Sequence, residues 1–211
     1  MADRTGHVKR LFVAVDIDDR TRAQVAELTV HLPSTLLRAA PSNVEGLKAD
    51  ATASAGGVPR MTWVRPDRMH LTLEFFGEAD AAVERQVLGS LAHPFPLAPF
   101  DLAFNGLGFF PLRGAPRVLW LGISAGLAEL RQLHGLLQQR LGARGSARDS
   151  FHPHLTLARF RDRVGRRGIA ELAKIGASAG PCRIDRVTLY ESHLSPNGPA
   201  YSTLAQAALV P

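Results

Sequence analysis

The tetrapeptide His-Leu-Thr-Leu occurs twice in this chain, at residues 70–73 and again at residues 154–157. Each copy follows a proline, runs into apolar residues, and then leads into a polar turn and a helix-like segment. Side chains of an extended strand alternate between its two faces, so the histidine and threonine share one face and the leucines share the other. Each copy therefore predicts a strand that is anchored by two leucines and presents one imidazole and one hydroxyl group.

The other predicted elements follow a similar order in the two halves of the chain. In the first half, strands are predicted at residues 10–15, 62–64 and 70–76, and helices at 20–32 and 79–91. In the second half, strands are predicted at 101–110, 118–123, 154–157, 184–191 and 201–209, helices at 127–141 and 164–175, and a turn at 195–198. Apolar periodicity and turn residues carry these assignments. Strand, helix, histidine strand and helix recur, which predicts a duplicated α+β architecture.

Two segments show no sustained periodicity. Residues 33–57 are rich in Ala, Ser, Gly and Pro, and this composition predicts a long mobile loop. We interpret that loop as a solvated insertion, with a substrate contact through Lys48 as the alternative. Residues 142–150 form a shorter and more basic loop that leads into the second motif, which places it at the rim of a site.

Composition limits the classes of protein to which this chain can belong. It has 211 residues, enough for one large domain or two joined lobes, and 45% of them are hydrophobic. The single cysteine, Cys182, excludes a disulfide framework and favours the cytoplasm. No apolar run approaches the roughly 20 residues that span a bilayer. The apolar run after Lys9 and Arg10 is soon followed by Asp16, Asp18 and Asp19, which predicts no signal peptide. The net charge of +6 favours anionic partners.

Two imidazoles at one site are the minimum set of groups for metal-free acid–base chemistry on a phosphate ester. With an ordinary pKa of about 6.5, imidazole can take up or give a proton at neutral pH. The two threonine hydroxyls can donate hydrogen bonds to the non-bridging phosphate oxygens. A single histidine on a strand is more often structural, but two with identical neighbours favour a site. The residues alone do not show which of the two histidines is the acid and which is the base.

Two other classes of function are disfavoured by the residues. A metal site is disfavoured because the motifs supply no thiolate and one carboxylate, Glu74, on the predicted face of His70. A noncatalytic RNA-binding protein is disfavoured because the sequence shows no aromatic and basic platform of the RNA-recognition type. We therefore expect neither a metal nor a cofactor.

Other polar and aromatic residues have two interpretations. His152 lies in phase with His154 and has a supporting or a structural role. Phe12 is interpreted as core packing, with base stacking as the alternative. Four arginines are interpreted as solvated, with guidance of an RNA backbone as the alternative: Arg65, Arg113, Arg161 and Arg163.

Several blocks of the sequence, in order, resemble one known family. They are Arg10-Leu-Phe-Val-Ala-Val-Asp16, Trp63-Val-Arg-Pro66, His70-Leu-Thr-Leu-Glu-Phe-Phe-Gly-Glu78, Arg117-Val-Leu-Trp-Leu-Gly122, Phe151-His-Pro-His-Leu-Thr-Leu-Ala-Arg159, Leu189-Tyr-Glu-Ser192 and Gly198-Pro-Ala-Tyr201. The chain resembles the 2H phosphoesterase superfamily, and more narrowly its bacterial and archaeal RNA 2′,3′-cyclic phosphodiesterases, also called 2′-5′ RNA ligases. The resemblance covers nearly the whole length and departs at residues 33–57, a stretch longer than the family usually has.

The resemblance implies a fold and an activity. The implied fold is a single α+β domain with two lobes, residues 1–95 and 96–211, whose antiparallel sheets line a central cleft with helices outside. The C-terminal strands are expected to complete the other lobe. The implied activity is hydrolysis of RNA 2′,3′-cyclic phosphate ends, such as those of tRNA halves, to 2′-phosphomonoesters by a monomer, with reversible 2′-5′ ligation. A small cyclic nucleotide, ADP-ribose cyclic phosphate or a 2′-5′ oligonucleotide is the alternative substrate.

The resemblance also assigns roles to residues. His70 would be the proton donor and His154 the proton acceptor. Thr72, Thr156 and Arg159 would bind the phosphate. By strict alternation Arg159 faces away from His154, so its role requires a bulge or a strand end.

Overall fold

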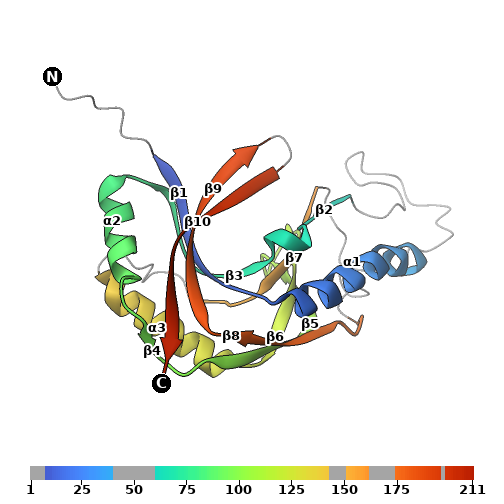
Figure 1. Cartoon of the computed structure of the whole chain (residues 1–211). Helices are drawn as coiled ribbons and strands as arrows, with labels where there is room; N and C mark the ends of the chain where they lie inside the picture. Colours follow the sequence, from blue (N-terminus) through green and yellow to red (C-terminus); the bar gives the residue numbers. More distant parts are fainter. Residues whose placement is uncertain (1–7, 40–59, 143–150, 162–173, 196–197) are drawn as a thin grey trace.

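The structure is a computed structural model that describes residues 8–39, 60–142, 151–161, 174–195 and 198–211 (Figure 1). The first half contains β1 (Lys9–Asp16), α1 (Asp19–Ala39), β2 (Met61–Trp63), the short 3-10 helix η1 (Pro66–Arg68), β3 (His70–Ala79), α2 (Ala81–Ser90) and β4 (Phe95–Pro96). The second half contains β5 (Phe100–Phe110), β6 (Val118–Ala125), α3 (Leu127–Leu141), β7 (Leu155–Phe160), β8 (Ser178–Ile184), β9 (Arg186–Ser195) and β10 (Gly198–Val210). The described α-helices lie outside the strands, with α2 beside α3 and α1 against β8.

The strands form two five-stranded sheets that exchange strands across the middle of the chain. The first sheet has the order β3-β1-β9-β10-β4, and the second has the order β2-β7-β6-β5-β8. The C-terminal strands β9 and β10 thus join the sheet of the first histidine strand, whereas β2 joins the sheet of the second. Neighbouring strands pair antiparallel, apart from β10 and β4. The expected two-lobed α+β fold with mostly antiparallel sheets is confirmed.

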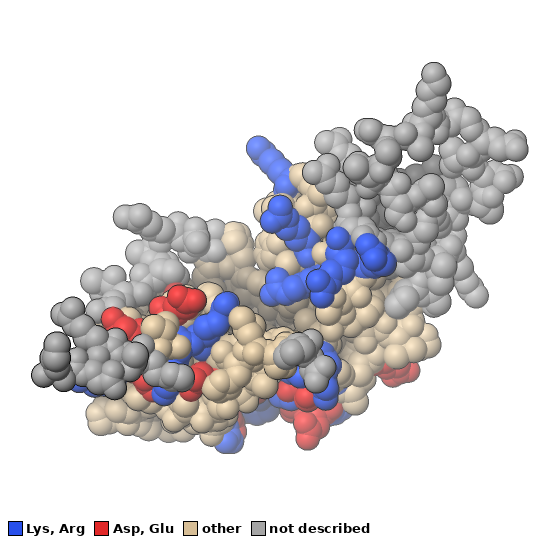
Figure 2. Space-filling view, turned by 90° about the horizontal axis from the view of Figure 1, so that it is seen from above, with Lys and Arg blue, Asp and Glu red and all other residues tan. Residues whose placement is uncertain are grey.

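Basic side chains gather on one face of the molecule. In the view from above, Lys and Arg side chains form a group without acidic side chains among them, and the visible Asp and Glu side chains lie apart (Figure 2). This face therefore carries a basic patch.

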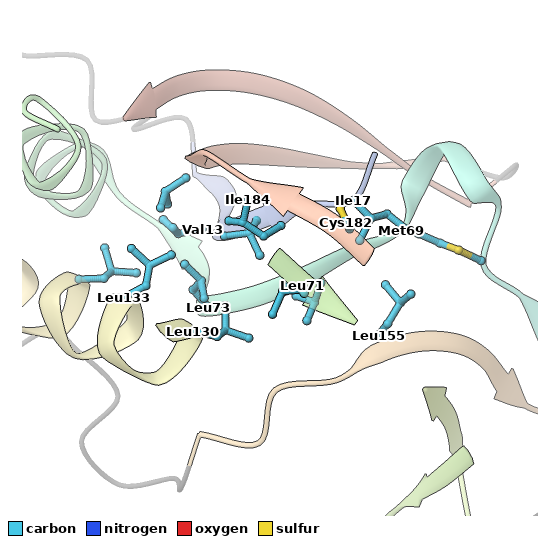
Figure 3. Packing of buried hydrophobic residues seen from close by; sticks show 14 of the residues in the cluster. Val13, Ile17, Met69, Leu71, Leu73, Leu130, Leu133, Leu155, Cys182 and Ile184 are labelled. Atoms are coloured by element: carbon cyan, nitrogen blue, oxygen red, sulfur yellow. The ribbon is translucent and has the colours of Figure 1, made fainter. Parts of the chain in front are cut away.

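The leucines of both repeats lie in one hydrophobic core that joins the two sheets (Figure 3). Leu71 and Leu73 of β3 are buried, as are Leu155 and Leu157 of β7. Burial of one leucine side chain stabilises the fold by about 1.5–3 kcal/mol. From α3 the core receives the leucines that helical spacing places on one face: Leu130, Leu133, Leu137 and Leu141. Because β3 and β7 are in contact here, the core fixes the two histidine strands next to each other.

Helix α1 is longer than the sequence predicted. A proline inside a helix removes one hydrogen bond and crowds the preceding turn, at a cost of about 3 kcal/mol, so the helix was expected to end at Leu32. The helix instead continues through Pro33 to Ala39, because the residues after the proline are mostly strong helix formers. The loop prediction for residues 33–57 is therefore wrong at its start, and residues 40–59 lie outside the described residues. No helix of the described ranges is long and apolar enough to cross a membrane.

Strand β8 was not predicted, and a strand was expected to begin only at Ile184. Its segment contains Gly180 and Pro181, and proline cannot donate a hydrogen bond to a neighbouring strand. The strand is possible because β8 forms the edge of the second sheet. Residues 164–173 of the helix predicted at 164–175 and most of the basic loop at 142–150 lie outside the described residues, and Lys174 and Ile175 are not helical.

Candidate active site

A cleft of about 650 Å³ opens between the two lobes. Its walls come from β2, β3, β7 and the hairpin of β9 and β10. The five residues that the sequence suggested for the site all line this cleft: His70, Thr72, His154, Thr156 and Arg159. The fold thus brings together two motifs that are far apart in the sequence.

The two histidines are held in the same way. Nδ1 of His70 lies 2.8 Å from the carbonyl oxygen of Arg68, and Nδ1 of His154 lies 2.7 Å from the carbonyl oxygen of His152. A carbonyl oxygen can only accept a hydrogen bond, so Nδ1 is the donor in both rings. This bond fixes the tautomer and leaves Nε2 of each ring as the atom that can exchange a proton with a substrate.

A β-bulge in β7 brings Arg159 into the cleft. The register between β7 and β6 shifts between Thr156 and Ala158, and Leu157 and Ala158 are both buried. The bulge resets the alternation of side chains along the strand. Arg159 therefore lies on the cleft side with His154, where strict alternation would have turned it away.

The matching bulge in β3 removes Glu74 from the cleft. The register with β1 shifts between Thr72 and Glu74, and Glu74 is only 4% exposed. Its carboxylate accepts a hydrogen bond from the side chain of Gln138 on α3. The expectation that Glu74 shares a face with His70 is wrong because it assumed strict alternation. Among the described residues, no three or more His, Cys, Asp or Glu side chains are placed to hold a metal ion.

Aromatic rings surround His70. The ring of Phe12 stacks on the imidazole with centroids 4.7 Å apart, and Tyr201 meets it edge-on at 5.3 Å. Burial lowers the pKa of His70, whereas the hydrogen bond to the carbonyl of Arg68 and the nearby carboxylate of Asp16 act to raise this pKa. Phe12 is 3% exposed, in agreement with its interpretation as a core residue, and it packs against the ring of His70.

Asp16 is itself fixed next to His70. It is the partner of His70 in the pairing of β1 with β3. Its two carboxylate oxygens accept hydrogen bonds from the hydroxyl groups of Tyr190, at 2.7 Å, and Thr188, at 3.0 Å. Burial and the hydrogen bond to Asp16 raise the pKa of Tyr190 to about 12, so its phenol remains a donor at neutral pH. A carboxylate in this position favours a positive charge on the imidazole.

His154 has a cation as its neighbour instead. Phe110 meets its ring edge-on at 4.9 Å, and Trp120 lies 6.1 Å away. Burial lowers the pKa of His154; the hydrogen bond to the carbonyl of His152 opposes that shift, and the positive charge of Arg159 adds to it. The two imidazoles therefore differ in their charged neighbours, because the carboxylate of Asp16 opposes the cation Arg22 near His70, whereas only the positive charges of Arg159 and His152 act on His154.

The cleft also contains residues that sequence reasoning did not assign to the site. They are Trp63, Arg65, Arg68, Arg161 and Tyr201, among others. Trp63 and Tyr201 belong to sequence blocks that resemble the family, and those blocks were the signal from which a site role could have been predicted. Arg65 and Arg161 are exposed, as their interpretation as solvated residues stated, and they also line the cleft. Arg161 donates from Nε to the hydroxyl of Thr62 at 2.7 Å.

The other described residues that had two interpretations from the sequence do not line this cleft. His152 contributes its backbone carbonyl to the orientation of His154, while its ring lies 6.3 Å from that of Phe110. Arg113 is exposed between β5 and β6. Arg163 and Lys48 lie outside the described residues.

Known proteins resemble this chain in sequence and in fold. A family model described as the 2′-5′ RNA ligase superfamily matches residues 38–196. An RNA 2′,3′-cyclic phosphodiesterase of Aeropyrum pernix is 34% identical over 155 residues, which cover 70% of this chain and 85% of that protein. An RNA 2′,3′-cyclic phosphodiesterase of Archaeoglobus fulgidus is 32% identical over 201 residues, which cover 92% of this chain and 97% of that protein. The apo structure of E. coli LigT matches with a TM-score of 0.65 and 26% identity, covering 97% of this chain and 99% of LigT.

The matched family segment contains both histidine motifs, and the matched structure covers both sheets. Sequence, fold and the convergence of the two motifs at one cleft agree. The chain belongs to the 2′-5′ RNA ligase superfamily of 2H phosphoesterases.

Proposed function

We propose that this protein hydrolyses the 2′,3′-cyclic phosphate ends of RNA to 2′-phosphomonoesters by acid–base catalysis with two histidines. The observation that carries this proposal is the pair of imidazoles that line one cleft, each held through Nδ1 by a backbone carbonyl so that Nε2 can exchange a proton. The relatives of Aeropyrum pernix and Archaeoglobus fulgidus are named RNA 2′,3′-cyclic phosphodiesterases, which supports the choice of substrate. Solved complexes of E. coli LigT with ATP, 3′-AMP and phosphate support a cleft that accepts nucleotides.

In the proposed reaction, water attacks the phosphorus in line with the departing 3′ oxygen of the ribose. His154 takes the proton of the water on Nε2 while the new phosphorus–oxygen bond forms. His70 gives the proton of its Nε2 to the 3′ oxygen while the bond from phosphorus to that oxygen breaks. Thr72 and Thr156 donate hydrogen bonds to the non-bridging oxygens, and Arg159 balances their charge. The products are a 2′-phosphate and a 3′-hydroxyl group.

The charged neighbours support this order of acid and base. A general acid must be protonated before the reaction, and the carboxylate of Asp16 stabilises the protonated form of His70. A general base must be neutral, and the guanidinium of Arg159 destabilises the protonated form of His154. The family resemblance implied the same order, which the sequence alone left open.

A groove next to the cleft supports RNA over a small cyclic nucleotide. This groove, of about 1,040 Å³, shares Arg159 and Arg161 with the cleft and extends to Arg117. In the described chain, cleft and groove together are lined by five arginines and by no Asp or Glu: Arg65, Arg68, Arg117, Arg159 and Arg161. A continuous basic track suits the phosphates of a strand, whereas a mononucleotide would use only the cleft.

The proposal includes the finer expectations from the sequence. The substrates would be RNA ends such as those of tRNA halves. A cytoplasmic monomer is supported by a cleft that takes both histidines from one chain and by the single buried thiol of Cys182.

The test is to map the product end of a short RNA that carries a 2′,3′-cyclic phosphate, with EDTA present. We expect hydrolysis to continue in EDTA and phosphorus NMR to show a 2′-phosphate. A 3′-phosphate would mean that the substrate binds in the opposite sense. A rate that is lost in EDTA and restored by zinc or manganese would contradict the two-histidine mechanism.

A further inference from the structure

The cleft and the outer groove meet at a junction, which we define by the residues that line both: Thr62, Arg159, Arg161, Gly198 and Pro199. Thr62 comes from β2 and Arg159 from β7, and Arg161 directly follows β7. Gly198 and Pro199 belong to β10 and bring no polar side chain. Among the described residues, the polar side chains of the junction therefore all come from β2 and the end of β7, which lie next to each other (Figure 1).

Thr62 draws the guanidinium of Arg161 back toward the catalytic residues. Thr62 pairs with Arg159 across the two strands, so their side chains share a face. Nε of Arg161 donates to the hydroxyl of Thr62 at 2.7 Å, and the backbone nitrogen of Arg161 donates to the carbonyl oxygen of Arg60 at 2.8 Å. The guanidinium therefore lies at the level of Arg159, two residues nearer to His154 than its own backbone.

The junction offers hydrogen-bond donors to an anion. A guanidinium carries five N–H donors, and the bond to Thr62 uses only the one on Nε. The two terminal nitrogens of Arg161 thus keep the planar fork that binds phosphate oxygens in pairs. Arg159 and Arg161 are both exposed, and no described Asp or Glu lines the cleft or the groove. A phosphate at the junction therefore meets no competing carboxylate.

The distance from the catalytic residues fits one nucleotide. In the proposed mechanism the reacting phosphate binds to Thr72 and Thr156. Three residues of β7 separate Thr156 from Arg159, which corresponds to about 10 Å of strand. One ribose with its two phosphates spans a distance of this size. The 5′ phosphate of the last nucleotide is also the first group of an RNA strand to leave the active site, and the cleft opens into the groove here.

We propose that Arg161, oriented by Thr62, binds the phosphate that links the last two nucleotides of the RNA substrate. This inference rests on the proposed function, because it takes the cyclic phosphate to lie between the two histidines. Arg161 contacts the substrate, whereas Thr62 is a positioning residue that acts through Arg161. The junction would thus recognise the charge of the last linkage, which a nucleoside 2′,3′-cyclic phosphate lacks.

The experiment removes this charge from the substrate and its partner from the protein. Two tetranucleotides end in a 2′,3′-cyclic phosphate, and one of them has a neutral methylphosphonate as its last linkage. Both carry a 2′-O-methyl group before that linkage, which protects it from cleavage. Wild-type kcat/KM should be about tenfold lower for the neutral linkage, at the low end of the contribution of hydrogen bonds to a charged group.

The variants test whether Arg161 and Thr62 cause that ratio. In Arg161→Gln the ratio of the two kcat/KM values should fall to about one, because the missing guanidinium distinguishes neither linkage. Thr62→Val keeps the branched shape and removes the hydroxyl, and should lower the ratio to about threefold. The double variant should match Arg161→Gln, since Thr62 acts through Arg161. Arg85→Gln, on the exposed side of α2, makes the same charge change and should keep the tenfold ratio.

The outcomes separate this inference from the proposed function. Wild-type protein that hydrolyses both RNAs equally well overturns the phosphate site alone. A tenfold ratio that persists in Arg161→Gln, or a ratio that falls equally in Arg85→Gln, overturns it as well. Wild-type protein that hydrolyses neither RNA removes the proposed function and this inference together.

Discussion

The carboxylate next to His70 should determine the alkaline limb of the pH–rate profile. A general acid is active while protonated, so the rate falls as pH rises through its pKa. Asp16 acts to raise the pKa of His70, and Asp16→Asn removes that charge while keeping the side-chain shape. The alkaline limb of kcat/KM should therefore move to lower pH. An alkaline limb that stays in place while the acidic limb moves would reverse the roles of the two histidines.

Arg159 should determine the acidic limb of the pH–rate profile. A general base is active while neutral, so the rate falls as pH falls through its pKa. Arg159 acts to lower the pKa of His154, so Arg159→Gln should raise this pKa and move the acidic limb to higher pH. The same variant should raise KM because it removes a phosphate ligand. A change in KM with a stationary limb would limit Arg159 to binding.

Removal of either histidine should nearly abolish turnover. His70→Ala and His154→Ala should each lower kcat by roughly 10² to 10⁴, the usual contribution of a positioned acid or base. The double variant should be little slower than the slower single variant, because the two imidazoles act in one step. Single-turnover kinetics with circular dichroism as a folding control checks this. Near-normal turnover of either single variant would remove that histidine from the mechanism.

At the scale of elements, a buried contact ties α3 to both histidine strands. Gln138 contacts Glu74 of β3, its side-chain nitrogen lies 3.0 Å from Nε2 of His134, and the ring of His134 stacks on Phe151 at 4.0 Å. Burial lowers the pKa of His134, which keeps the ring neutral and able to accept a hydrogen bond at neutral pH. Phe151 begins the segment that carries His154, so this contact supports both motifs.

Loss of Gln138 should therefore destabilise the fold. Gln138→Ala removes a donor from the buried carboxylate of Glu74, and loss of a partner from a buried polar group costs about 1–3 kcal/mol. Urea unfolding measures the change in the free energy of unfolding. Gln139→Ala, at the exposed neighbouring position of α3, is the control and should have little effect. Equal stability of the two variants would show that the contact does not hold the strands.

Sequence patterns predicted the strands but not their bulges. The alternation of histidine and threonine with leucine correctly placed Leu71 and Leu155 in the core. Alternation did not hold beyond the threonines, because each strand has a bulge there. A bulge depends on the pairing of a strand with its neighbour, which the sequence of one strand does not encode. Glu74 was therefore assigned to the wrong face, whereas Arg159 lines the cleft through the bulge that its expected role required. Strand β8 was missed for a related reason, since Pro181 is compatible with a strand only at a sheet edge.

At the scale of the whole molecule, the strand exchange places the site between the lobes. Sequence order suggested one histidine strand in each half, and this arrangement is found. The order of the elements in the sequence did not show that β2 joins the sheet of β7, where Thr62 pairs with Arg159. This crossing puts Trp63 and Arg65 into the cleft beside residues of both motifs. The basic track thus depends on long-range pairing that local patterns do not predict.

That track should make the rate on RNA depend on salt in a way that the rate on a mononucleotide does not. Arg117 lines only the outer groove, so Arg117→Ala should lower kcat/KM for an oligonucleotide with a cyclic end. The slope of log kcat/KM against log salt concentration should become shallower by about 0.7, the value for one phosphate contact on a single strand. Hydrolysis of a cyclic mononucleotide should be unchanged, and Arg85→Ala should leave both substrates unaffected. The contrary result would be that Arg117→Ala lowers kcat/KM for the mononucleotide as much as for the oligonucleotide. That result would contradict binding of the RNA strand in the groove and would favour a small cyclic nucleotide as the substrate.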